Sequence, residues 1–167
     1  GHQAGTAITT GVKNTSIGAR TMQATTVGQE NVALGYQAMY TNVDGSKCVA
    51  IGANALLTQD PASAVDMYNV AIGYNAGYAV TTGINNTLIG GLAGDALTTG
   101  SGSVALGYNA LGSTTTAIEN VAIGINALVA NVDGAKNVAV GSYALTALDP
   151  ASATDMYNVA VGHNAGL

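Results

Sequence analysis

The chain has 167 residues, of which 48% are hydrophobic and only 8% are charged, and its formal net charge is −5. Its four basic residues are too few and too scattered to neutralise a phosphate backbone, so we expect no nucleic-acid partner. No apolar run reaches the length of a membrane span, so no membrane insertion is predicted. A surface with so few charges is expected to be partly buried, most simply between copies of the chain.

A five-residue phrase that ends in glycine recurs along the chain, and Asn69-Val-Ala-Ile-Gly73 is typical of it. Nine copies cover residues 14–18, 31–35, 48–52, 69–73, 86–90, 103–107, 120–124, 137–141 and 158–162. The closing glycines are 17 residues apart, except for two steps of 21 residues. A short fixed period indicates one supersecondary element stacked on copies of itself. The sequence therefore predicts an all-β fold, a parallel β-solenoid of about nine 17-residue coils.

Within each phrase the side chains alternate as they do in a β-strand, with Val and Ile on one side and Asn and Ala on the other. We expect the Val and Ile side to face the inside of each coil, and the Ala side to lie near contacts between chains. The glycine ends the strand at a bend. A second, shorter strand is predicted after it, as at Ala55-Leu56, and then a turn such as Thr98-Thr99-Gly100.

Stacking converts each position of the repeat into a column along the rod. The first position is nearly always asparagine, and its amides are predicted to bond along the axis as a ladder. The members of this ladder are Asn14, Asn31, Asn69, Asn86, Asn120, Asn137 and Asn158, and Cys48 and Ser103 interrupt it. Charged residues occupy the preceding column, so we expect Lys47 to pair with Glu30, and Lys136 with Glu119.

A larger period lies over the short one. Residues 1–78 match residues 90–167 at about half of their positions. Residues 1–167 are therefore interpreted as a single repeat array, and as a segment of a longer fibre.

The two 21-residue steps lengthen the turn at equivalent places, residues 60–68 and 149–157. Insertions on one face of a repeat protein often make contacts, and both loops combine Asp, Met and Tyr, so we predict contact loops. Their contact residues are Asp60, Asp66, Met67, Tyr68, Asp149, Asp155, Met156 and Tyr157. The four aspartates are also weak candidates for a Ca²⁺ site, and the competing interpretation is that they cap turns.

The sequence favours a protein that is not an enzyme and needs no cofactor. His2 and His163 occupy equivalent columns nine coils apart, and no triad-like cluster of nucleophile, base and acid is present. Tyr36, Tyr74 and Tyr108 share a column just after the glycine. They are expected to pack between chains or, alternatively, to stack on sugars of a cell surface.

The stretches Asn69 to Gly77 and Ser103 to Leu111, with a Thr-Thr-Gly turn before the next copy, resemble the repeats of phage tail fibres and trimeric bacterial adhesins. They are also similar to the heads of YadA-type trimeric autotransporters, whose repeat is shorter. This resemblance implies a left-handed β-roll, three chains side by side as a homotrimer, and a shaft or adhesion role. It also implies a location in the virion or outside the cell, with a host-surface glycan or protein as a partner.

The repeat pattern and its resemblance are compatible with three functions. The first is the shaft and adhesion module of a phage tail fibre that attaches to a host cell surface. The second is a bacterial trimeric surface adhesin or a subunit of an extracellular filament. The third is an ice-binding solenoid, which needs an unbroken threonine array, whereas Val43-Asp44 and Val132-Asp133 interrupt the Thr-Thr pairs.

Overall fold

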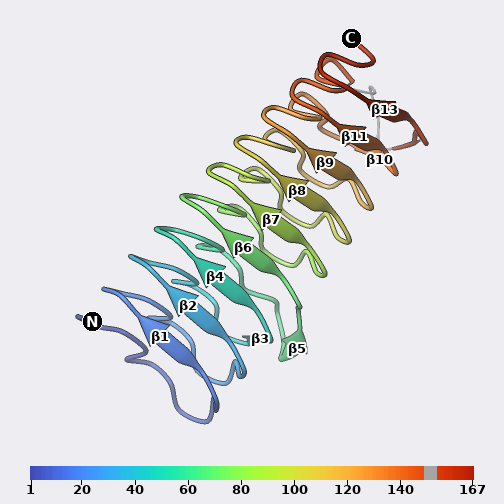
Figure 1. The fold of residues 1–167 in the computed structure, drawn as a ribbon. Coiled ribbons are helices and arrows are strands. Elements are labelled where there is room, and N and C mark those ends of the chain that lie inside the picture. The colour runs from blue at the N-terminus through green and yellow to red at the C-terminus, as the bar shows by residue number, and fades with distance from the viewer. Residues whose placement is uncertain (149–153) are drawn as a thin grey trace.

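The computed structural model describes residues 1–148 and 154–167, which form a rod of stacked coils without a helix. Nine three-residue strands make one parallel sheet along the rod, and the N- and C-termini lie at its opposite ends (Figure 1). These strands are β1 (Thr15–Ile17), β2 (Val32–Leu34), β4 (Val49–Ile51), β6 (Val70–Ile72), β7 (Thr87–Ile89), β8 (Val104–Leu106), β9 (Val121–Ile123), β11 (Val138–Val140) and β13 (Val159–Val161). The predicted parallel β-solenoid is confirmed.

Two small sheets flank the large one where the chain has its long turns. In the first, β3 (Gly45–Ser46) pairs in parallel with β5 (Val65–Asp66), and in the second, β10 (Gly134–Ala135) pairs with β12 (Thr154–Asp155). With only these short strands described, no part of residues 1–148 or 154–167 forms a helix that could span a membrane.

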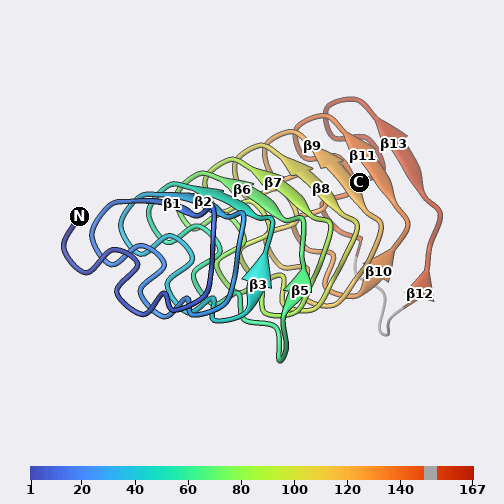
Figure 2. The same cartoon turned by 90° about the horizontal axis from the view of Figure 1, so that it is seen from below.

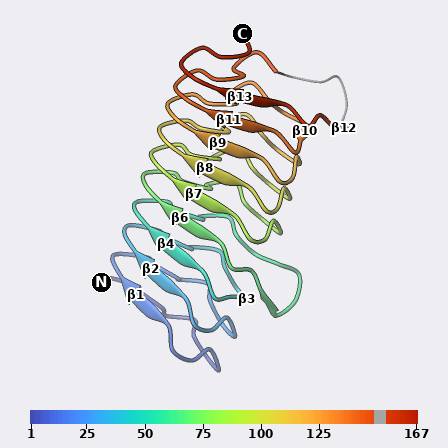
Figure 3. The same ribbon diagram turned by 45° about the vertical axis from the view of Figure 1, so that its right-hand side comes forward.

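Successive coils pair in strict register. Ala50 of β4 lies opposite Ala33 of β2 on one side and opposite Ala71 of β6 on the other. The step from β4 to β6 is one of the two long ones, so four additional residues leave the register of the sheet unchanged. The additional length leaves the coil as a protruding loop before β5, which is visible in Figures 2 and 3.

The orientation predicted for the strands is wrong. The central alanine of each strand, such as Ala71 or Ala122, is fully buried, whereas the flanking Val and Ile side chains point outward and are partly exposed. The physical reason is the narrow coil, because the opposite wall sends Leu56, Leu111 and equivalent side chains into the same interior. Only a methyl group fits against them at the middle of the strand.

The second wall of the coil is hydrogen-bonded between coils, but it is not the predicted strand. Alternate residues have positive φ, for example Asn54 at 59° and Leu56 at 49°. Asn54 N–H donates to Tyr36 O of the preceding coil at 2.9 Å, and Leu56 N–H donates to Ala76 O of the next coil at 3.1 Å. Asparagine tolerates the left-handed region, but leucine does so with strain, which burial of its side chain offsets.

In the core, a larger side chain on one wall of the coil is matched by smaller residues on the facing wall. Leu88 replaces alanine at the centre of β7, and glycine replaces leucine at positions 77 and 94 on the facing wall. A Cβ added to either Gly77 or Gly94 would lie 2.8 Å from a methyl carbon of Leu88. The glycines therefore make room for Leu88.

The asparagine ladder is confirmed, although most of its bonds run to the backbone. Asn86 is fully buried, its Oδ1 accepts the N–H of Ser103 at 3.0 Å, and its Nδ2 donates to Gly100 O at 2.9 Å. Direct bonds between ladder amides occur from Asn137 to Asn120 and from Asn158 to Asn137, both at 3.1 Å. The ladder amides from Asn14 to Asn137 thus each connect their coil to the next coil at two points.

The interruption of the ladder at Cys48 is bridged by another column. Gln59, which is also fully buried, accepts a hydrogen bond from Asn69 Nδ2 at 3.0 Å and donates one to Cys48 Sγ at 3.3 Å. Burial raises the pKa of the Cys48 thiol, which therefore stays protonated.

The glycine that ends each strand brings adjacent coils into close backbone contact. Gly107 has φ of 138°, and a Cβ placed on it would lie 2.6 Å from the carbonyl oxygen of Gly124 in the next coil. The same contact recurs from coil to coil, so these glycines form a ladder in which the backbone of one coil occupies the side-chain space of another.

We expect Gly107→Ala to lower the free energy of unfolding by at least about 3 kcal/mol, because the new methyl group meets backbone that cannot rotate away. Chemical denaturation followed by circular dichroism measures the change.

Two controls separate the causes. Gly162 has a similar φ of 131°, but only Ala165 Cβ lies near its missing side chain, at 3.8 Å, so Gly162→Ala should lose only the conformational part, about 1–2 kcal/mol. Gly91→Ala, whose Cβ would meet only the Tyr108 ring, should change stability by less than about 0.5 kcal/mol. Equal losses for Gly107→Ala and Gly91→Ala would contradict this account of the ladder.

Candidate functional site

The outer face of the nine-stranded sheet is a continuous aliphatic strip. The outward positions of each strand form two columns that run the length of the sheet. The first holds Thr15, Val32, Val49, Val70, Thr87, Val104, Val121, Val138 and Val159, and the second holds Ile17, Leu34, Ile51, Ile72, Ile89, Leu106, Ile123, Val140 and Val161. None of the nine strands contains a charged residue. No described segment of the chain covers this face, so its side chains, partly exposed along the middle of the sheet and more exposed at its two ends, are available for contacts.

The tyrosine column borders this strip. Tyr36, Tyr74 and Tyr108 follow the strand-ending glycines directly, and all three side chains are exposed. The sequence placed them in one column, and the in-register sheet confirms that placement.

The first long loop is anchored by a cluster of three side chains. Lys47 Nζ lies 2.7 Å from Asp66 Oδ2 and 3.3 Å from the hydroxyl oxygen of Tyr68, which itself donates to Asp66 Oδ2 at 3.2 Å. The ammonium group also lies 5.4 Å from the centre of the Tyr68 ring, within cation–π range. The cluster ties the end of the loop to the coil before it.

The same cluster recurs 89 residues later in the second long loop. Lys136 Nζ lies 2.7 Å from Asp155 Oδ2 and 3.4 Å from the Tyr157 hydroxyl oxygen, with the ring centre again at 5.4 Å. The pairing predicted for these lysines is therefore wrong: each pairs with an aspartate of the following loop, not with the preceding glutamate. The charged residues nevertheless lie in successive coils as predicted, because the backbone N–H of Lys47 donates to the carbonyl oxygen of Gln29, the residue before Glu30.

Glu30 instead pairs with Lys13, the charged residue one coil before it, at 3.2 Å. This exposed pair contributes about 0–1 kcal/mol.

Residues of the first loop divide between core and surface. Met67 is fully buried and Pro61 is buried, and both pack against Gly45, so Met67 is not the surface contact that the sequence suggested. Tyr68 is half exposed, and Asp60 and Tyr68 are the predicted contact residues of this loop that lie at the surface. In the second loop Asp149 lies outside the described residues, Met156 is partly buried and Tyr157 is exposed.

The aspartates of the loops are engaged by protein groups. Asp60 Oδ1 accepts the N–H of Val43 in the preceding coil at 3.1 Å, and Asp66 and Asp155 bind lysines. Among residues 1–148 and 154–167, no three His, Cys, Asp or Glu side chains gather in a way that could hold a metal ion.

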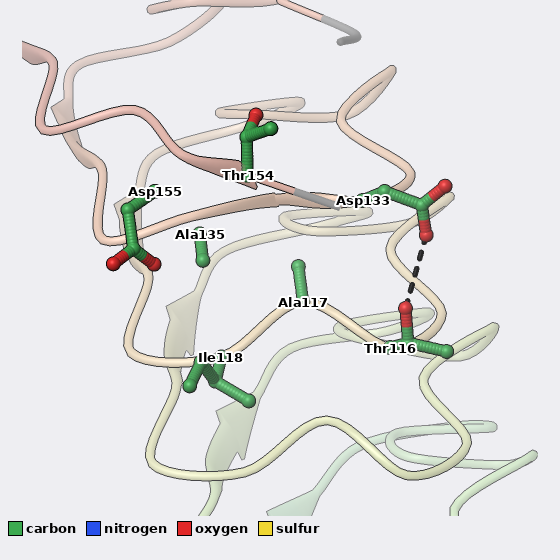
Figure 4. Close-up of a pocket in the computed structure, with 7 residues that line it drawn as sticks. All are labelled: Thr116, Ala117, Ile118, Asp133, Ala135, Thr154 and Asp155. Atoms are coloured by element: carbon green, nitrogen blue, oxygen red, sulfur yellow. Dashed lines mark hydrogen bonds between the residues drawn. The ribbon is translucent and has the colours of Figure 1, made fainter. Parts of the chain in front are cut away.

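A pocket of about 360 Å³ lies beside β10 and β12. Ala117 and Ala135 are among its lining residues, and the hydroxyl of Thr116 donates to Asp133 Oδ1 at 3.0 Å, the bond dashed in Figure 4. The pocket presents methyl groups, hydroxyls and carboxylates. Among the described residues, no Lys, Arg, His or Cys side chain lines it.

The two histidines lie in the first and last coils. His163 packs edge-on against Tyr143, with ring centres 6.0 Å apart.

Comparisons with known proteins add no relative. The chain matches no protein-family model, no curated protein and no solved structure. The aliphatic strip extends over all nine strands of the large sheet.

The lysine–aspartate clusters predict a specific acid titration. The hydrogen bond from Lys47 is the main cause that lowers the pKa of Asp66 below its usual range, and Lys136 does the same for Asp155. Because each folded-state pKa lies below the unfolded value, the stabilisation is complete above the ordinary aspartate range. It is lost only as pH falls through the lowered pKa.

We expect Lys47→Met to raise the pKa of Asp66 toward the ordinary value of about 3.9, and to leave that of Asp155 unchanged. Lys136→Met should do the converse. Carboxyl carbon chemical shifts recorded by NMR during an acid titration measure both groups in each variant. A variant that leaves its own aspartate unmoved would show that the ion pair is not formed in solution.

Proposed function

We propose that the chain is a structural segment of a fibre, in which three copies associate side by side through the aliphatic strip. The solenoid then serves as a rigid spacer and adhesion module of the kind found in phage tail fibres, attached to a host cell surface. Its place would be the virion, or the outside of the cell if the parent is a bacterial adhesin or filament subunit.

The observation that carries this proposal is the uncharged outer face of the sheet. The two columns hold Val, Ile or Leu everywhere except at Thr15 and Thr87, and these apolar side chains lose water favourably when covered, at roughly 25 cal/mol per Å². The strip extends over eight coil steps, or about 38 Å. Continuous apolar patches of this kind mark interaction surfaces in soluble proteins.

A second copy of the chain fits this face because its outward side chains repeat at the same spacing, one row for each coil. When parallel copies lie in register, each aliphatic row of one sheet meets the equivalent row of another at every coil. Three such faces meeting on a common axis would enclose all the columns. The trimer itself is suggested by the resemblance of the repeat phrase to trimeric fibres.

A spacer role is supported by the bonding between coils. Backbone hydrogen bonds, the asparagine ladder and the glycine ladder each connect successive coils. No coil can tilt without breaking several of these contacts at once, so the rod resists bending. Tyr68 and Tyr157, five coils or roughly 24 Å apart, are outward points for contact with a neighbouring chain or a receptor.

Ice binding is less well supported. The flat face of the sheet carries threonine only at Thr15 and Thr87 among its outward positions, and the remaining positions are Val, Ile and Leu. A regular hydroxyl array is therefore missing from the nine strands.

Sedimentation of the 167-residue chain tests the association. We expect the wild-type protein to sediment as a trimer and Ile89→Glu, at the middle of the strip, to sediment as a monomer, because the charge cannot be buried unpaired. Thr82→Glu, which adds the same charge at an exposed turn, should remain trimeric. Circular dichroism should show the same strand signal for all three proteins. A wild-type monomer, or an Ile89→Glu trimer, would overturn the proposal.

A further inference from the structure

From Tyr36 to Tyr108, tyrosine occupies its column only at every second coil, whereas the aliphatic strip has a side chain at every coil. The exposed fractions of Tyr36, Tyr74 and Tyr108 are 50%, 60% and 55%. Each is two coils from the next, and the intervening position holds a small residue, Ala53 or Gly91. Because one coil advances about 4.8 Å, the three rings repeat every 9.6 Å or so.

The small residue before each tyrosine in the column leaves room for its ring over the preceding coil, and Tyr108 uses that room. A Cβ on Gly91 would be 3.6 Å from Cδ2 and 3.9 Å from Cε2 of Tyr108, so this ring lies over the backbone of the coil before it. Tyr74 is preceded in the same way by Ala53, and Tyr36 by Ala19. The column therefore presents three separate aromatic platforms rather than one continuous stack.

Amide groups accompany the rings in the adjacent column. Asn54 Nδ2 donates to Asn75 Oδ1 at 3.0 Å, and Asn109 Nδ2 donates to Asn126 Oδ1 at 2.9 Å. These bonds orient the amides in pairs along the axis. Within the described structure, the Nδ2 groups of Asn75 and Asn126 have no acceptor, and both residues are partly exposed. Neutral hydrogen-bond donors thus lie beside apolar rings.

This combination fits a carbohydrate chain. A pyranose ring has a flat C–H face that packs on an aromatic ring and equatorial hydroxyls that bond to amides. In an extended β-1,4-linked chain, a pair of sugars spans nearly the same length as two coils of the rod. Every second sugar can therefore meet a tyrosine. About five sugars span the four coils, or roughly 19 Å, from Tyr36 to Tyr108.

We propose that Tyr36, Tyr74 and Tyr108 form a linear binding platform for a neutral β-1,4-linked polysaccharide that lies parallel to the rod. This inference rests on the proposed function, since it assigns the host-surface contact to the side of the fibre. The sheet face and the tyrosine column are distinct, so the trimer and the platform can fail independently.

The probes are the soluble hexasaccharides of β-1,4-linked glucose and β-1,4-linked N-acetylglucosamine, titrated calorimetrically into the wild-type chain. We expect at least one to bind, and the α-1,4-linked glucose hexasaccharide, whose chain curls, not to bind. Replacing all three tyrosines by alanine should weaken binding about tenfold or more. The matched triple replacement by phenylalanine, which retains the rings, should stay within about threefold of wild type.

Tyr78→Ala, at an exposed tyrosine outside the column that has no part in the proposed contacts, serves as the control and should bind like wild type. Sedimentation of each variant separates the two proposals, because the triple alanine variant should keep the wild-type oligomeric state. Failure of the wild type to bind either β-1,4-linked probe, or unchanged binding by the triple alanine variant, would overturn the platform. If the triple alanine variant sediments differently, the tyrosines pack between chains and the platform is again overturned.

Discussion

The close backbone approach at the strand-ending glycines is the constraint on which the rest of the structure depends. A glycine such as Gly107 leaves the space of a side chain to the carbonyl group of the next coil. The coils can then stack at the spacing of parallel strands, which brings the asparagine amides within hydrogen-bonding distance of the next coil. The glycine position is therefore a condition for the sheet, and the flat outer strip follows from the sheet.

The same constraint decides how the interior is used. Coils that are narrow and tightly stacked leave an interior of methyl groups, a few Leu and Met side chains, and buried amides. In the strands of the large sheet the central position holds a small side chain in all but β7, and the Val, Ile and Leu side chains on either side of it lie outside, which makes the outer sheet face apolar. The property that holds one chain together thus also leaves a surface suited to association between chains.

Much of the fold could be predicted from the sequence, because period and column are directly visible in it. The parallel register and the ladder through Asn86 follow from the spacing alone. Alternation did not reveal which side is inside, since it is symmetric between the two faces. The positive φ of Leu56 could not be predicted, because leucine normally avoids that conformation and its presence in a sequence does not indicate it. Lys47 was assigned the wrong partner because the inserted loop brings Asp66 nearer than Glu30.

Because the sheet register is unchanged across the 21-residue steps, the length of the rod and the length of its loops are independent of each other. Loop residues can be inserted before β5 without disturbing β4 or β6, and whole coils meet each other through the same backbone contacts wherever they lie. Unequal recombination between repeats would therefore add or remove complete coils and change the reach of the rod in steps of about 4.8 Å. Reach and loop sequence could then diversify separately, each without the need for a new interface.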